Sequence, residues 1–263
     1  GTYSATLTSA TTGTATITGT LNGAAIADDA QVTVGVGSGS PLTTLITTAA
    51  GSITAGGNTT VTVQVRDAAN NNVTVGGATV ALNASSGSVG TVTDNNDGTY
   101  TATFSSTLAA TATITGTLNS VSITDNAVVT VNPAAVSAAT STVAAGTASI
   151  AASNGTPSST ITVTARDQFS NLVPSAAVTL ASTGSANTFT PSSGSTNASG
   201  VFTTEFSSTL AEAKTIAATA GGVGITQTAA VTVTPAAASA STSQITANPT
   251  TVSSDVGTST ITV

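Results

Sequence analysis

An internal repeat of about 100 residues runs through the whole chain and sets the size of its folding units. Residues 1–34 (GTYSATLTSATTGTATITGTLNGAAIADDAQVTV) align without gaps with residues 98–131 (GTYTATFSSTLAATATITGTLNSVSITDNAVVTV), which lie 97 positions later (98 − 1 = 97). Residues 200–233 repeat the pattern 102 positions further on (200 − 98 = 102). Because this period is the length of one β-sandwich domain, the chain is predicted to fold as a row of similar domains.

The repeat divides the chain into four segments. Residues 1–35 are predicted to be the C-terminal part of one domain, 36–133 and 134–235 two complete domains, and 236–263 the N-terminal part of a further one. We therefore expect a segment of a longer array, whose first partners are the neighbouring domains of the same chain. Prolines in the linkers NPAAV (132–136) and TPAAA (234–238) restrict the backbone, which favours an extended rod. The linker GVGSGSPL (35–42) is predicted to be the hinge.

Within each repeat, apolar residues alternate with Thr or Ser in segments separated by Gly, Asn, Asp and Ser. Such segments in the first complete repeat are 59–67, 78–85, 98–106, 110–119 and 126–131. This alternation is typical of β-strands with one buried face, and no segment has the apolar periodicity of a helix. The fold class is predicted to be all-β.

Large apolar residues recur at equivalent positions of the repeats, where a core requires them. The aligned sets are Tyr3, Tyr100 and Phe202; Leu7, Phe104 and Phe206; Ile17, Ile114 and Ile216; and Ile26, Ile123 and Ile225. Exchanges within each set keep side-chain volume roughly constant, as packed positions tolerate. We expect Phe104→Ala to cost roughly 3–5 kcal/mol of stability.

Two further motifs carry a resemblance to a known family. The run VTVQVRD (61–67) is followed by Asn71, Val73 and ATVAL (78–82), and ITVTARD (161–167) is followed in the same way by Asn171, Val173 and AVTL (177–180). Together with DNNDGTY (94–100), these resemble the bacterial immunoglobulin-like repeats of the intimin and invasin adhesins. The resemblance implies tandem immunoglobulin-like β-sandwich domains, arranged as beads on a string, that act mainly as a stalk. It also implies a tyrosine corner at Tyr100, whose hydroxyl bonds upstream backbone; Phe202 cannot form this bond in the next repeat.

The composition argues against most chemistry. The chain has 3 basic and 10 acidic residues and no His, Cys, Met or Trp. Nucleic-acid binding requires a basic surface, which three basic residues do not provide. Without imidazole or thiol groups the usual general bases, nucleophiles and transition-metal ligands are missing, so we do not expect an enzyme. Oxidation-sensitive side chains are also missing, which favours an extracellular location on the cell surface. No apolar run is long enough to insert into a membrane.

Two sets of acidic residues allow a structural or a functional interpretation. Asp94 and Asp97 could supply oxygen ligands to calcium, the one cofactor considered, but Asp and Asn are also the residues that tight turns favour. Asp67 and Asp167 each follow an arginine and precede an asparagine by four residues. They could contact a ligand or close an Asx-type turn after a strand, and we favour the turn for both sets.

Other binding functions have weaker support in the sequence. Thr-x-Thr runs could bind ice, but twisted sheets make poor flat lattices. A carbohydrate-binding module would use exposed aromatic residues, and nearly all aromatics here are at core-like positions. The N-x-[ST] sequons are as frequent as the composition predicts by chance. The preferred hypothesis is a stalk of a bacterial surface adhesin. The alternative is a building block of a self-assembling extracellular filament or sheath, in which copies of the chain pack through uncharged Thr and Ser faces.

Overall fold

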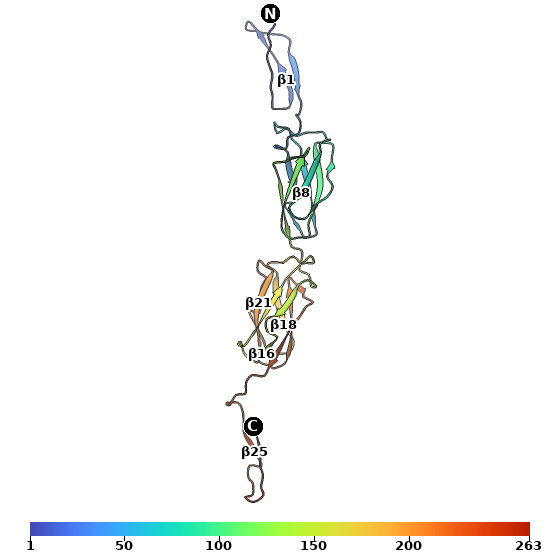
Figure 1. Cartoon of the computed structure of the whole chain (residues 1–263). Coiled ribbons are helices and arrows are strands. Elements are labelled where there is room, and N and C mark those ends of the chain that lie inside the picture. The colour runs from blue at the N-terminus through green and yellow to red at the C-terminus, as the bar shows by residue number, and fades with distance from the viewer. The chain divides into compact units, whose positions relative to one another are not determined.

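The computed structural model describes all residues, 1–263, and every regular element in it is a β-strand (Figure 1). The prediction of an all-β fold with tandem immunoglobulin-like sandwiches is confirmed. The chain divides into two compact units, residues 1–135 with 166–173, and residues 136–165 with 174–263. No helix has the length and apolar character that crossing a membrane requires.

The first unit contains a complete sandwich of two sheets. The first sheet consists of β5 (Leu45–Thr48), β7 (Asn58–Gln64) and β11 (Thr99–Ser105), with β9 (Ser88–Val89) and β10 (Thr93–Asp94) both paired to β11. The second sheet consists of β6 (Ser52–Thr54), β14 (Ala127–Asn132), β12 (Thr111–Leu118), β13 (Val121–Ser122) and β8 (Val80–Ala84). Only the β14–β6 pair of this sandwich is parallel.

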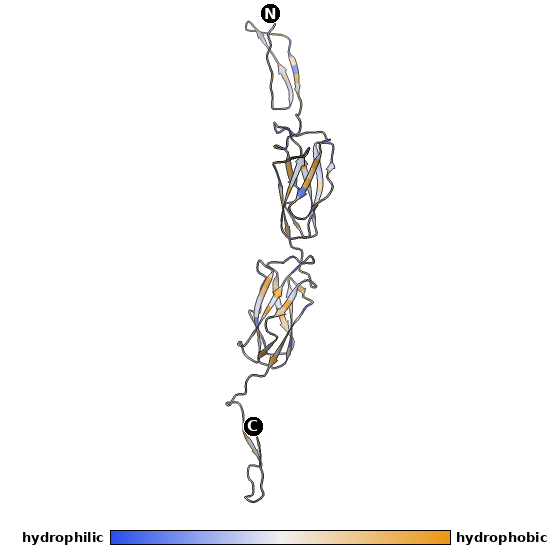
Figure 2. Ribbon diagram, viewed as in Figure 1, coloured by the Kyte–Doolittle hydropathy of each residue, from blue (hydrophilic) through white to orange (hydrophobic).

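The strands form because alternate residues face the core. In β14, Ala127, Val129 and Val131 are buried while the residues between them are exposed. The core between the sheets joins such positions from both, and its most enclosed large side chains include Phe104, Ile114 and Leu118. Figure 2 shows how the hydropathy of the residues is distributed along these strands.

The second unit contains a sandwich of the same type. One sheet consists of β15 (Thr142–Ala145), β17 (Ser159–Thr164), β21 (Val201–Ser208) and β19 (Asn187–Thr190). The other consists of β16 (Ser149–Ala151), β24 (Ala229–Thr234), β22 (Ala213–Ala220), β23 (Val223–Gly224), β18 (Ala177–Ser182) and β20 (Ser193–Ser195). Phe206 and Ile216 are fully buried in its core, and Phe202 is 8% exposed.

The first and last segments of the chain form hairpins. Residues 1–35 contain β1 (Gly13–Ile17) paired with β4 (Ala30–Val34), and β2 (Thr20–Leu21) paired with β3 (Ala24–Ala25). Residues 236–263 contain β25 (Thr246–Asn248) paired with β26 (Thr260–Thr262). Neither hairpin has a second sheet against it within its own segment.

The prediction that Tyr3 occupies a core position is wrong for this chain. Its side chain is 90% exposed, and Leu7, Ile17 and Ile26 are also exposed, although their counterparts near Tyr100 are buried. The reason is that residues 1–35 contain counterparts of β12 and β14 but none of β5, β7 or β8. No opposing sheet is therefore present to cover these side chains, and the stretch with Tyr3 forms no strand.

Candidate functional site at the Asp–Asn loops

The loop after β7 is closed by the carboxylate of Asp67. Its Oδ1 accepts hydrogen bonds from the backbone N–H groups of Ala69 (3.0 Å) and Asn71 (2.9 Å). The backbone N–H of Asn70 donates to the Asp67 carbonyl at 2.9 Å, and Asn70 has φ of 72°. Asn tolerates this left-handed conformation better than most residues, which explains its place in the turn. The geometry is that of an Asx turn.

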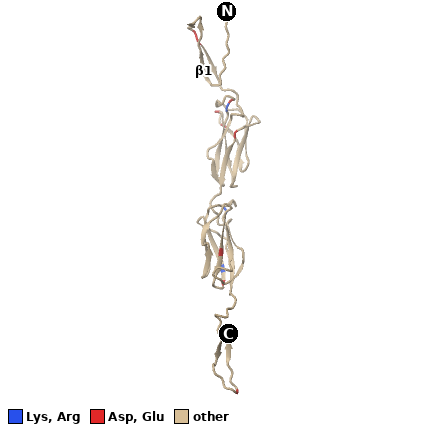
Figure 3. Ribbon diagram, turned by 90° about the vertical axis from the view of Figure 1, so that its left-hand side faces the viewer, with Lys and Arg blue, Asp and Glu red and all other residues tan.

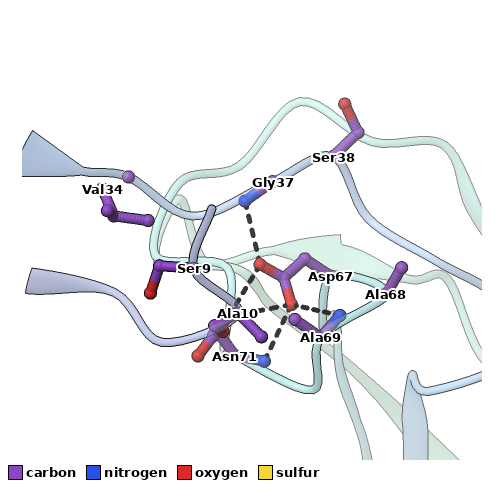
Figure 4. Close-up of a pocket in the computed structure, with 10 residues that line it drawn as sticks. Ser9, Ala10, Val34, Gly37, Ser38, Asp67, Ala68, Ala69 and Asn71 are labelled. Atoms are coloured by element: carbon purple, nitrogen blue, oxygen red, sulfur yellow. Dashed lines mark hydrogen bonds between the residues drawn. The ribbon is translucent and has the colours of Figure 1, made fainter. Parts of the chain in front are cut away.

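The second oxygen of Asp67 reaches beyond its own loop. Oδ2 accepts the backbone N–H of Gly37 in the linker at 2.9 Å, and the amide Nδ2 of Asn71 at 3.0 Å (Figure 4). The same Nδ2 donates to the carbonyl of Ala10 at 3.0 Å. Two side chains therefore connect the loop, the linker and the hairpin segment. We call this set of bonds the first junction.

The linker before β5 is also bonded through its backbone. The N–H of Ser40 donates to the carbonyl of Arg66 at 2.7 Å, and Gly39 forms an isolated β-bridge with Asp67. The prediction of a hinge at residues 35–42 rested on glycine content and left out these bonds. The structure gives the linker several backbone partners despite its composition.

The same arrangement recurs 100 residues later, at Asp167 (167 − 67 = 100). Oδ1 accepts the N–H groups of Phe169 and Asn171, both at 2.9 Å. Oδ2 accepts the linker N–H of Ala134 at 2.9 Å and Nδ2 of Asn171 at 2.8 Å. Nδ2 of Asn171 also donates to the carbonyl of Thr107 at 2.8 Å. All these residues belong to the first compact unit, and we call this set the second junction.

The partners of the two junctions are themselves equivalent in the repeat. Ala134 lies 97 positions after Gly37 (134 − 37 = 97), and Thr107 lies 97 positions after Ala10 (107 − 10 = 97). This is the offset between the first and second copies of the repeat. The bonds are therefore a property of the repeat unit, and each is made to a backbone atom of the partner, so that the partner's side chain can vary.

The second junction has two additional contacts. Oδ1 of Asn171 accepts the N–H of Ala109 at 2.9 Å, so this amide bonds the preceding domain through both of its ends. Phe169 lies against Gly56, where a Cβ atom would come within 2.8 Å of the ring. Gly56 has φ of 87°, so the position favours glycine for its backbone as well as for the ring contact.

Hydrogen bonds set the charge state of both aspartates. The amide of Asn71, with the backbone N–H groups of Gly37, Asn71 and Ala69, lowers the pKa of Asp67 to about 2. For Asp167 burial raises the pKa, but hydrogen bonds from Asn171, Ala134 and Phe169 outweigh it, and the pKa is lowered. Both carboxylates are therefore ionised at neutral pH, which strengthens each bond they accept.

A shallow pocket lies beside the first junction, and Ser9, Ala10, Val34, Gly37, Asp67 and Asn71 are among the residues that line it (Figure 4). Both carboxylate oxygens of Asp67 already accept N–H donors of the chain itself. The chemistry of the site is thus the binding of one part of the chain to another.

The calcium candidates also bond the chain itself. Asp94 accepts the N–H groups of Gly77 (2.7 Å) and Asn96 (2.8 Å), and Asp97 accepts the N–H of Thr99 (2.9 Å) and its hydroxyl. The bonds from Thr99 lower the pKa of Asp97. These are the interactions of tight turns, and no group of three or more acidic side chains is assembled for a metal ion.

The tyrosine corner differs between the two sandwiches. Tyr100 is buried, and its hydroxyl accepts the backbone N–H of Ala78 at 2.9 Å. In the second sandwich Phe202 has no hydroxyl, and the equivalent N–H, that of Ala176, donates instead to Oγ1 of buried Thr196 at 2.9 Å. The repeat alignment places Thr196 opposite Asp94, so sequence reasoning gave no reason to select it.

Sequence reasoning also missed a buried lysine. The side chain of Lys214 is fully buried in β22, at the position of Ala112 in the first sandwich. Its ammonium donates to the Ser185 carbonyl at 2.7 Å and pairs with Glu212, whose pKa this pairing lowers. A charge inside a Thr-rich strand was the available signal. Figure 3 shows how few and scattered the charged residues are.

Comparison with known proteins agrees with this architecture. Residues 40–134 match the family described as invasin, domain 3, and residues 140–234 match bacterial Ig-like domains of group 1. The chain belongs to the bacterial Ig-like repeats of the intimin and invasin adhesins. No curated protein matches the sequence.

Solved structures contain similar arrays of bacterial Ig-like repeats. InvD of Yersinia pseudotuberculosis is 24% identical with a TM-score of 0.58, and the match covers 82% of this chain and 66% of InvD. Invasin, a bacterial integrin-binding protein, is 21% identical with a TM-score of 0.61, over 86% of this chain and 46% of invasin. The Escherichia coli adhesin FdeC is 23% identical with a TM-score of 0.53, over 85% and 74%. At these identities the likeness concerns the fold, and the chain spans less than half of invasin.

Proposed function

We propose that this chain is a non-enzymatic spacer of a bacterial surface adhesin, a stalk in which Ig-like domains in series hold a binding region away from the cell. In this proposal residues 36–133 and 134–235 are the complete domains, and 1–35 and 236–263 are parts of their neighbours. The location is extracellular, at the cell surface. The family matches support an adhesin-type structural segment of this kind.

The recurrence of the junction is the observation that carries this proposal. Asp67 and Asp167 each bind a linker N–H, and Asn71 and Asn171 each bind a carbonyl of the domain that precedes their own. A stalk requires a connection that resists bending and can be repeated along an array. Bonds to backbone atoms meet the second requirement, because any linker residue except proline supplies an N–H.

The junction also accounts for a stiff connection without a large apolar interface. Each carboxylate accepts several charge-assisted bonds from segments that would otherwise move independently, and Asn71 and Asn171 hold the carboxylates in place. The linkers are short, so a few bonds at each junction restrict the remaining backbone freedom.

Electron microscopy of the purified chain tests the proposal. We expect single molecules seen as domains in a row, with the same angle between neighbouring domains from one particle to the next. A matched variant, Asp67→Ala with Asp167→Ala, is expected to keep the domains but to spread the angles between them. A stalk is contradicted if the wild-type domains collapse onto one another, or if their angles are as broadly spread as in the variant.

The alternative function, a unit of a self-assembling extracellular filament, is favoured by one specific feature. The first sandwich has an uncharged edge strand, β8, that pairs on one side only. In that case ordered fibres with laterally packed sandwiches would appear in the same images.

A further inference from the structure

The outer edge of β8 differs from the same edge of the second sandwich. β8 pairs with β12 and with no other strand. In the second sandwich the equivalent strand β18 pairs with β22 and also with β20, in the register Ala177↔Ser195, Val178↔Gly194 and Thr179↔Ser193. One sandwich thus covers this edge with its own chain and the other leaves it open.

The open edge arises from a change in pairing within the repeat. The segment equivalent to β20 is residues 91–93, 102 positions earlier (193 − 91 = 102). There Thr93 pairs with Thr101 of β11, in the opposite sheet. The segment that could have covered β8 is consequently held elsewhere.

The hydrogen-bond phase identifies which backbone groups of β8 are free. The N–H of Asn119 donates to the Thr79 carbonyl, and the N–H of Ser85 donates to the Thr113 carbonyl. In an antiparallel pair the bonding residues alternate, so Ala81 and Asn83 also bond β12. The N–H and C=O groups of Val80, Leu82 and Ala84 therefore point away from β12, towards the open side.

This edge lacks the features that usually prevent strand addition. Natural edges are protected by charged residues, proline or bulges. Residues 78–93 (ATVALNASSGSVGTVT) contain no charged residue and no proline. Two copies of the edge can therefore approach each other without like-charge repulsion.

We propose that β8 is a self-association site, at which β8 of a second copy of this chain pairs antiparallel about Leu82. In this register Val80 of one copy lies opposite Ala84 of the other, and Leu82 lies opposite Leu82. All three are outward-bonding residues, so their free N–H and C=O groups satisfy one another across the dyad. The two four-strand pairings merge into one continuous sheet.

The occupant follows from the parity and the chemistry of the strand. An antiparallel partner must offer outward-bonding residues at matching positions, and a second β8 does so in a centred register. β20 shows that this edge accepts an uncharged antiparallel strand, Ser193–Ser195. The inference is independent of the stalk proposal, because the junction bonds do not involve β8.

The register makes a specific prediction about side chains. Ala81 and Asn83 are exposed, so substitutions there leave the core unchanged. In the proposed pair, position 81 of one copy faces position 83 of the other. Ala81→Lys with Asn83→Lys places like charges opposite each other twice, whereas Ala81→Glu with Asn83→Lys places opposite charges there.

Sedimentation velocity of the full chain over a range of concentrations is the test. We expect a reversible dimer, whose dissociation constant is at least about tenfold weaker in the Lys/Lys variant than in the Glu/Lys variant. Thr179→Lys with Ala181→Lys, on the covered edge of the second sandwich, is the matched control and should leave the dimer unchanged. Slower amide exchange of Val80, Leu82 and Ala84 at high concentration would support the register.

Several outcomes would overturn the proposal. These are a chain that stays monomeric at all concentrations, equal association of the two β8 variants, or loss of the dimer in the control. A monomer that instead protects Val80, Leu82 and Ala84 on addition of a peptide of residues 189–197 would also overturn it, in favour of a strand from another domain as the occupant.

Discussion

The two complete sandwiches face the same two requirements of the backbone and meet them with partly different side chains. The N–H before β8 or β18 is bonded by Tyr100 in the first and by Thr196 in the second. The loop after β7 or β17 is closed by an aspartate in both, but Ala69 follows in one and Phe169 in the other. The comparison teaches that this repeat fixes its backbone hydrogen bonds and lets the residues that supply them change.

The largest effect is expected for Asp167→Ala. Asp167 is fully buried, and its loss leaves the N–H groups of Ala134, Phe169 and Asn171 without their acceptor. We expect the free energy of unfolding to fall by about 2–4 kcal/mol, measured by urea denaturation of the full chain. Asp67→Ala should cost less, because Asn71 is less buried than Asn171. An equal or larger loss for Asp67→Ala would break the comparison.

A smaller effect is expected for Thr196→Val, which keeps the shape of the side chain. The N–H of Ala176 is then buried without an acceptor, at a cost of about 1–3 kcal/mol. Tyr100→Phe removes the equivalent bond to Ala78, which is only partly buried, so its loss should be smaller. Thermal unfolding of both variants measures the difference, and an unchanged Thr196→Val protein would show that this hydroxyl is not required.

Phe169→Ala sharpens the comparison of the two junctions. The ring is 37% exposed and covers Gly56, so we expect a loss of about 1–2 kcal/mol in unfolding free energy. Phe169→Leu keeps part of the contact and should retain part of the stability. If both variants unfold as the wild type does, the ring adds nothing to the second junction.

The pH dependence of stability is the mildest test. Because the pKa of Asp67 is lowered from 3.8 to about 2 in the folded chain, its contribution is complete above about pH 4 and is lost as the pH falls towards 2. Asp167 acts in the same direction. Asp67→Asn should therefore lose less stability than the wild type over this range, as followed by circular dichroism. A variant with the same acid sensitivity would place that sensitivity elsewhere.

Much of the fold follows from the sequence, because the strands have a strict alternation and the repeat shows it several times. The buried positions of Phe104 and Phe206 could be expected from their alignment. Tyr3 could not be placed in this way, since alignment reports which residues are equivalent but not whether the opposing sheet is present. Its exposure of 90% follows from the missing strands around it.

The candidate site was only partly predictable. The Asp-to-Asn spacing in both repeats indicated a turn, because this is a local interaction of residues four positions apart. The bonds from Asn71 to Ala10 and from Asn171 to Thr107 join residues more than 60 positions apart, so no local pattern reports them. Thr196 was hidden for the same reason, as its partner is 20 positions away.

The central claim, that the Asp–Asn junctions restrict movement between neighbouring domains, can be tested by the distance between two spin labels. The chain has no cysteine, so Thr103→Cys and Thr203→Cys, both at exposed positions, give one label in each complete domain. Asn171→Ala removes the bonds to Thr107 and Ala109 but leaves the backbone turn of Asp167. We predict a single narrow distance distribution for the parent and a clearly broader one for Asn171→Ala. Distributions of equal width would contradict the account.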